Sequence, residues 1–232
     1  MNKQNKPERI IKKPNIPEKE LEKGLPDEQV QDRTHYAQCL LIDDDLAEQV
    51  SERVSFDQIL FQQVRMNNTL FKQTQVLDSR LTGCDLANAE WFKAAFHRVE
   101  LLDCHLTGFR SPEANFQDTL FKECSAAFAQ FRFATFKTVL FESCDLSDAD
   151  FEGANFSGVT FTNCNLRNVE LLGAKLVGVD LRGSKIDGLR AGPRELKGAI
   201  LDPAQALAFV RGLGIKVEYL EEDHEERRYN EV

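Results

Sequence analysis

A large apolar side chain recurs at every fifth position of the chain. The series starts at Leu46 and ends at Leu201, and 28 of its 32 positions hold a large apolar residue. Twelve of the 17 phenylalanines belong to it. A helix repeats its buried face about every 3.6 residues and a strand about every two, so neither element explains a period of five. We therefore interpret the chain as a repeat protein with one structural unit in every five residues.

The residues on either side of each large apolar position are also restricted. Two positions before it the side chain is small, as in Cys84 and Ala89, with Phe109 as an exception. Two positions after it Gly, Asn and Asp predominate, and these residues tolerate the backbone angles of turns. Two side chains in five thus point inward, and a corner every five residues closes a square coil in twenty. Coils stacked about 4.8 Å apart predict a rod of about eight coils and about 38 Å.

The residues CDLSDADFEGANFSGVTF at positions 144–161 lie close to the repeating pattern A(D/N)LXX, in which X is any residue. The unbroken register over residues 41–201 resembles the pentapeptide-repeat family. This resemblance implies an all-β fold, a right-handed quadrilateral β-helix solenoid. The residues GVDLRGSKIDGL, followed by QALAFVRGLGIKV, also resemble the end of the Qnr-type quinolone-resistance branch of that family.

Segments of a different composition flank the repeats. Residues 1–40 are polar and contain four of the seven prolines, so we expect a disordered start and a cap on the first coil. Within this extension EKELEKGL is compatible with one or two helical turns, and residues 28–43 are expected to form the cap. The acidic tail EEDHEERRYNEV, residues 221–232, is expected to be mobile.

Residues 202–220 predict a short helix and strand that cap the last coil. Asp202 suits the N-cap and Pro203 the first helical position. Gly212 or Gly214 is expected to end the helix. The residues IKVEY then alternate like a short strand.

The same cap is a candidate dimerisation module. In Qnr-type proteins a terminal helical module pairs two rods into a dimer, so the resemblance implies a homodimer here. Leu207, Val210 and Leu213 are the candidates for that contact. The alternative is that these three residues only cover the last coil.

Five of the six cysteines lie twenty residues apart, one in each coil. Their sulfurs would form a row about 4.8 Å apart, which cannot converge on a tetrahedral zinc ion. The β-carbons would also lie beyond the ~3.8 Å usual for a disulfide. Because free cysteine packs as a small hydrophobe, we predict a reduced packing column. Its members are Cys84, Cys104, Cys124, Cys144 and Cys164. Cys39 lies outside this series and is expected to be the more reactive thiol.

The sequence contains no arrangement typical of catalysis. His97 and His105 point outward on different faces in the repeat register, and neither has the nucleophile and acid that a triad needs. The glycines follow the turn period and form no phosphate-binding loop. We therefore predict a protein that is not an enzyme and that needs no cofactor and no metal.

Charge and hydropathy restrict the location and the class of partner. No apolar run reaches the roughly 18 residues of a membrane span, and MNKQNKPERIIKKP has no apolar core after its basic residues. We therefore expect a cytoplasmic protein with no membrane association. A net charge of −9 argues against direct binding to nucleic acid.

The densest acidic cluster in the repeats is a candidate interaction surface. Qnr-type proteins are thought to mimic DNA and to dock in the DNA-binding saddle of DNA gyrase, and the resemblance extends this role to the cluster. Its members are Glu142, Asp145, Asp148, Asp150 and Glu152. The alternative is an ordinary solvated face. Unlike many Qnr-type proteins the chain has no loop insertion between residues 46 and 201, so any contact with a topoisomerase must differ.

Some outward positions are apolar where the register favours polar residues. Phe128 and Phe133 occupy corner positions, and Leu120 and Leu140 occupy one outward column, one coil apart. A contiguous apolar patch would mark a partner site. The alternative is a slightly irregular corner.

Two functions fit these observations. The first is a non-enzymatic interaction protein, a DNA mimic that binds a type II topoisomerase such as DNA gyrase and protects it from inhibitors. The second is a scaffold or adaptor with an unknown protein partner. That partner would bind the surface of Phe128 and Phe133 or the N-terminal segment.

Overall fold

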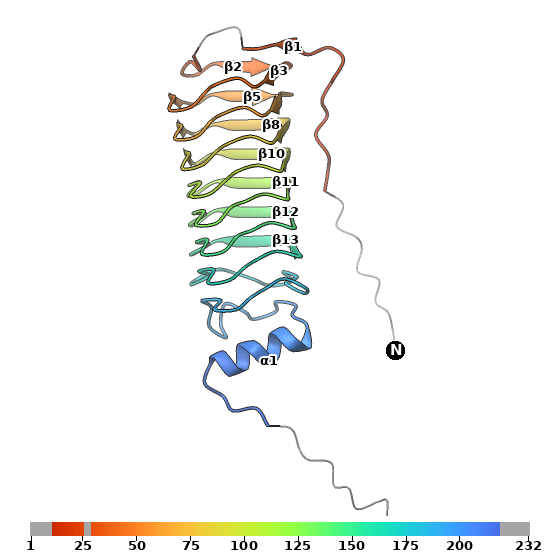
Figure 1. Cartoon of the computed structure of the whole chain (residues 1–232), viewed down its shortest axis with the longest axis vertical. Coiled ribbons are helices and arrows are strands. Elements are labelled where there is room, and N and C mark those ends of the chain that lie inside the picture. Colours follow the sequence, from red (N-terminus) through yellow and green to blue (C-terminus); the bar gives the residue numbers. More distant parts are fainter. Residues whose placement is uncertain (1–10, 26–28, 219–232) are drawn as a thin grey trace, which may run out of the picture.

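The chain folds into a rod of stacked coils with one helix at its C-terminal end (Figure 1). The computed structural model describes residues 11–25 and 29–218. The first part of the expected disordered start, residues 1–10, and the acidic tail 221–232 lie outside the described residues. None of the helices in the described ranges is long and apolar enough to span a bilayer.

The described chain forms short strands and a single helix. Their bounds are β1 (Glu22–Lys23), β2 (His35–Ala37), β3 (Cys39–Ile42), β4 (Val50–Glu52), β5 (Ser55–Asp57), β6 (Leu60–Gln62), β7 (Leu70–Lys72), β8 (Gln75–Thr82), β9 (Glu90–Phe92), β10 (Ala95–Leu102), β11 (Asn115–Lys122), β12 (Thr135–Glu142), β13 (Asn155–Thr162) and α1 (Pro203–Gly212). All strand pairs are parallel, and from β2 onward the paired residues lie twenty positions apart. The predicted all-β solenoid with a short C-terminal helix is thus confirmed.

One ladder shows the length of the solenoid in the described residues. It runs from His35 to Lys175 through eight residues that are separated by seven turns of the chain. The ladder therefore begins at His35, six residues before the boundary at 41 that the apolar period predicts. The period of five continues into this first turn, because Tyr36 and Leu41 precede Leu46 at intervals of five and are buried.

Left-handed backbone angles form the corners of the coils. The residue two positions after each large apolar centre has a positive φ, whether it is Asn68 (φ 57), Lys93 (φ 56) or Phe133 (φ 57). Such angles cost a non-glycine residue roughly 1–2 kcal/mol. Hydrogen bonds to the next coil compensate for this conformational cost. The corner amide of Lys93, for example, donates to the carbonyl of Pro112 at 3.1 Å. The stacked backbone, and not the side chain, therefore holds these corners.

The core consists of columns of like side chains along the rod axis. The rings of Phe96, Phe116, Phe136 and Phe156 stack with centroid distances of 4.7, 4.9 and 5.1 Å. Large inward residues and the small residues two positions before them are both buried. The predicted inward positions are thus confirmed, and the apolar columns exclude water from the inside of the rod.

The cysteine column lies inside the rod. All six cysteines are free and buried. Each thiol of the column lies near the carbonyl 23 residues earlier, as with Cys104 Sγ and Leu81 O at 3.5 Å. The column is therefore packing material, as the sequence predicts.

Cys39, the thiol expected to be the more reactive one, is buried as well. Cys39 fills a small inward position in β3 and is 5% exposed. Burial, and to a smaller extent the charge of Glu22, raises the pKa of this thiol. Cys39 lies two positions before Leu41, so it follows the period of five on a different side of the coil.

The N-terminal extension also differs from the prediction. Glu22 and Lys23, inside EKELEKGL, form strand β1 beside Cys39 and Leu40 and not a helical turn. Their backbone hydrogen bonds join them to a distant segment of the chain. Local helical propensity carries no information about such contacts. Residues 11–20 then extend down the outside of the rod (Figure 1).

The C-terminal helix begins as the sequence predicts. Asp202 caps α1 by accepting the N–H of Gln205 at 2.9 Å, and Pro203 occupies the first turn. The Gln205 side chain is buried and donates to Leu181 O and Ser184 O at 2.6 and 2.7 Å, which fixes the helix on the last coil. The expected strand IKVEY does not form over residues 215–218, and its last residue lies outside the described part.

Phe136→Ala is expected to lower the free energy of unfolding by about 3–5 kcal/mol, since it opens a cavity in the stacked aromatic column. Urea unfolding followed by circular dichroism measures the change. Lys137→Ala is the matched control, because Lys137 is the next residue and is exposed. It should change the free energy by no more than about 0.5 kcal/mol. A loss below about 1 kcal/mol for Phe136→Ala would contradict the packing of this column.

Candidate interaction surfaces

Ion pairs between neighbouring coils dominate the charged surface of the rod. Arg80 Nε lies 2.7 Å from Glu100 Oε2, and Lys122 Nζ lies 3.1 Å from Glu142 Oε1. Within the described ranges, nine pairs of Lys or Arg with Asp or Glu join residues twenty positions apart: Asp45–Arg65, Asp78–Arg98, Arg80–Glu100, Glu90–Arg110, Lys93–Glu113, Lys122–Glu142, Arg132–Glu152, Arg167–Asp187 and Glu170–Arg190. Each contributes about 0–1 kcal/mol where it is exposed. At these positions the charge therefore changes sign from one coil to the next.

The predicted acidic cluster occupies successive sides of one coil. Asp145 and Asp150 belong to different parallel ladders and so lie on different sides. Asp148 lies at the corner between them and is exposed. These carboxylates are neighbours in the sequence, but the corners direct them around the rod and not along it.

Most of the cluster is engaged by neighbouring side chains. Arg132 donates to both Asp150 and Glu152 at 2.6 Å. Asp145 accepts the side-chain amide of Asn165 at 2.9 Å. The cluster therefore presents less free negative charge than its sequence indicates, and Asp148 is its most exposed member.

The two histidines of the repeats lie in separate polar surroundings. His105 Nδ1 lies 3.4 Å from Asp85 Oδ1, and His105 Nε2 lies 3.0 Å from the Thr107 hydroxyl. The His97 ring contacts the Arg98 guanidinium, with nitrogens 3.0 Å apart. In the part of the chain that the structure describes, no group of three His, Cys, Asp or Glu residues could hold a metal ion.

Phe128 and Phe133 lie at corners of one coil and are 59% and 61% exposed. The Phe133 ring lies over Gly153 of the next coil, where an added Cβ would meet the ring at 2.5 Å. Leu172 is 59% exposed. Its carbonyl oxygen accepts a hydrogen bond from the Gly153 amide at 2.9 Å. Phe128 and Phe133 lie at two successive corners, and we call the exposed apolar set of Phe128, Phe133 and Leu172 the apolar corner. The sequence analysis missed Leu172, although the register places it at an outward position.

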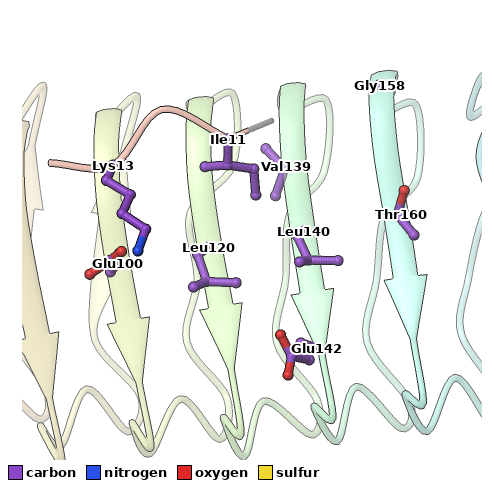
Figure 2. A pocket seen from close by; sticks show the side chains of 9 residues that line it. All are labelled: Ile11, Lys13, Glu100, Leu120, Val139, Leu140, Glu142, Gly158 and Thr160. Carbon is purple, nitrogen blue, oxygen red and sulfur yellow. The ribbon is translucent and has the colours of Figure 1, made fainter. Parts of the chain in front are cut away.

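The outward side chains of Leu120 and Leu140 are half-buried, and they line a groove together with Ile11 and Lys13 of the N-terminal segment. Figure 2 shows Ile11 above these two leucines and Lys13 beside Glu100. The space between the segment and the strands is a groove of about 260 Å³. The sequence analysis missed this contact, because a single isoleucine in a polar extension carries no periodic signal.

Asp78 holds the same N-terminal segment at a second point. Its Oδ1 accepts the Asn15 amide at 3.0 Å and Arg98 Nε at 2.6 Å. Burial alone would raise the pKa of Asp78, but the hydrogen bonds from Arg98 and Asn15 outweigh it, so this pKa is lowered. The carboxylate is therefore charged at neutral pH and available to both donors.

The three candidate dimer residues of the C-terminal cap differ in exposure. Leu207 and Val210 are half-buried, whereas Leu213 is 48% exposed. Leu213 and Phe209 line a groove of about 390 Å³ between α1 and the last coil. The helix thus covers the coil and leaves an apolar residue exposed at its C-terminal end.

Several solved structures are similar to this chain. HetL, a pentapeptide repeat protein involved in heterocyst differentiation regulation from Nostoc sp. strain PCC 7120, is 18% identical, with 77% of this chain and 92% of HetL covered and a TM-score of 0.34. Full-length QnrB1, a plasmid-mediated fluoroquinolone resistance protein, is 17% identical, with 78% of this chain and all of QnrB1 covered and a TM-score of 0.37. No curated protein matches the chain.

The family comparison agrees with the geometry. A parallel solenoid with a corner every five residues and a turn every twenty is what the repeat pattern predicts. The model of the pentapeptide repeat region matches residues 74–151, 94–171 and 114–190, which together span half of the chain. The chain therefore belongs to the pentapeptide repeat family.

Proposed function

We propose that the chain is a non-enzymatic rod that binds a protein partner through its outer surface. The apolar corner carries this proposal. Other coils place Lys93 and Glu113 at the corner position of Phe133, so the solenoid itself does not require an apolar residue there. Exposed aromatic residues are typical of protein interfaces. The net charge of −9 also favours a protein partner over nucleic acid.

All six cysteines are free, and free thiols persist in a reducing compartment. The proposal therefore includes a cytoplasmic location.

The double substitution Phe128→Asp and Phe133→Asp is expected to abolish capture of the partner in affinity purification, because it places two charges in the contact. Val177→Asp is the matched control, since Val177 is 70% exposed and lies outside the apolar corner. It should leave capture intact. Capture that is equally strong with the double variant would refute a role for this corner.

A type II topoisomerase, DNA gyrase, is the finer candidate for the partner, with DNA mimicry as the mode of binding. The acidic excess and the exposed Asp148 support it, since negative potential steers a protein toward a DNA-binding saddle. The alternation of charge between coils weakens that potential. A scaffold or adaptor with another partner is the alternative.

If gyrase is the partner, the purified chain should reduce quinolone inhibition of gyrase supercoiling at micromolar concentration. Asp148→Lys should weaken this protection, because it reverses the most exposed charge of the cluster. Asp43→Lys is the control, since Asp43 is an exposed corner residue far from the cluster. Supercoiling and inhibition that are unchanged by the wild-type chain would rule out gyrase.

We also propose that the C-terminal cap pairs two rods. Leu213→Asp is then expected to convert the protein from a dimer, with twice the chain mass of 26.4 kDa, to a monomer in sedimentation velocity. The added charge would lie in the apolar contact. Ala204→Asp, which is exposed on the opposite side of the same helix, should leave the dimer intact. A monomeric wild-type chain would contradict this proposal.

A further inference from the structure

Residues 11–18 form an extended arm on the outside of the rod (Figure 1). The Asn15 carbonyl accepts Gln58 Nε2 at 2.8 Å, and the Asn15 amide donates to Asp78 Oδ1 at 3.0 Å. Glu18 Oε1 lies 3.1 Å from Arg80 Nη1. These partners belong to successive coils, so the arm crosses the strands and runs along the rod axis.

The arm borders a groove with apolar walls. Ile11 lines this groove together with Leu120 of β11 and Leu140 of β12, and Lys13 extends toward Glu100 of β10 (Figure 2). The groove continues past Ile11 to Glu142. It thus combines two outward leucines with carboxylates, and the arm fills only part of it.

The two leucines are not needed by the solenoid. Their ladder reads Leu40, Leu60, Arg80, Glu100, Leu120, Leu140, Thr160, Asp180 along the rod. Charged and polar residues therefore fit the same outward position in other coils. Leu120 and Leu140 form an outward apolar pair on the groove that Ile11 also lines.

The arm is held weakly. Its ion pair between Arg80 and Glu18 is exposed, and such pairs contribute about 0–1 kcal/mol. The adjacent strands already pair with their neighbours on both sides, so the arm adds no strand to the sheet. Side chains and two hydrogen bonds at Asn15 are what hold it. A competing segment with the same chemistry can therefore replace it.

We propose that this groove is a docking site for an extended segment of a partner protein. The segment carries a branched aliphatic residue followed two positions later by lysine or arginine, as Ile11 and Lys13 do here, and the arm occupies the site in the free chain. The aliphatic side chain contacts Leu120 and Leu140, and the cation lies near Glu100. This inference rests on the proposed protein-binding role and adds a second surface to the apolar corner.

A peptide with the sequence of residues 11–20, IKKPNIPEKE, labelled with a fluorophore at its C-terminus, tests the proposal. Its binding to the full chain is followed by fluorescence anisotropy, at protein concentrations up to about 1 mM to reach weak affinities. Ile11→Asp with Lys13→Glu releases the arm. This variant should bind the peptide at least about tenfold more tightly than the wild type, whose site is mostly occupied. Lys12→Glu, an exposed arm residue that does not line the groove, should behave as the wild type.

Two further measurements make the result decisive. Hydrogen exchange of the Asn15 amide should be faster in the released variant than in the wild type. Adding Leu120→Thr and Leu140→Thr to the released variant should abolish peptide binding without unfolding, because Thr160 occupies the same column. Binding that survives these changes would overturn the proposal.

Absence of peptide binding to the released variant, or an Asn15 amide that stays as protected as in the wild type, would equally overturn it. Partner capture that still depends on Phe128 and Phe133 in that case leaves the protein-binding role standing. Loss of partner capture with intact peptide binding would instead refute the apolar corner alone.

Discussion

The parallel ladder that joins each residue to the residue twenty positions later is the interaction on which the rest of the structure depends. It provides backbone partners for coils that have only short strands, and it compensates the left-handed angles at corners such as Lys93. It also sorts side chains into columns along the rod axis. Because a coil cannot bury its inward residues alone, the neighbouring coil completes each layer of the core.

The same register determines what the outer surface can present. Opposite charges at matching positions of neighbouring coils pair along the axis, as in Arg80 and Glu100, so the acidic excess is distributed and partly neutralised. Against this background the outward apolar residues are informative. Leu120, Leu140 and Phe133 satisfy no requirement of the solenoid, and the two leucines line a groove together with the N-terminal arm. These outward apolar residues are therefore the candidates for the contact with a partner.

The inward half of the molecule could be predicted from the sequence because its period is local and unbroken. The period identifies Phe136 and the cysteine column as core residues, and the residue types identify Asp202 as a helix cap. The structure agrees with both predictions. The arm and strand β1 could not be predicted, since their contacts are with distant coils. The acidic cluster was misleading for a related reason, because corners send sequence neighbours such as Asp145 and Asp150 to different sides.

The spacing of the coils can be measured directly by pulsed electron paramagnetic resonance. Gln75 and Lys175 are exposed residues of one ladder, five coil steps apart. Spin labels at these two positions should give a narrow distance distribution near about 24 Å, at about 4.8 Å for each step, apart from the reach of the labels. A broad distribution, or a mean that departs from this value by more than the label length, would contradict the twenty-residue register.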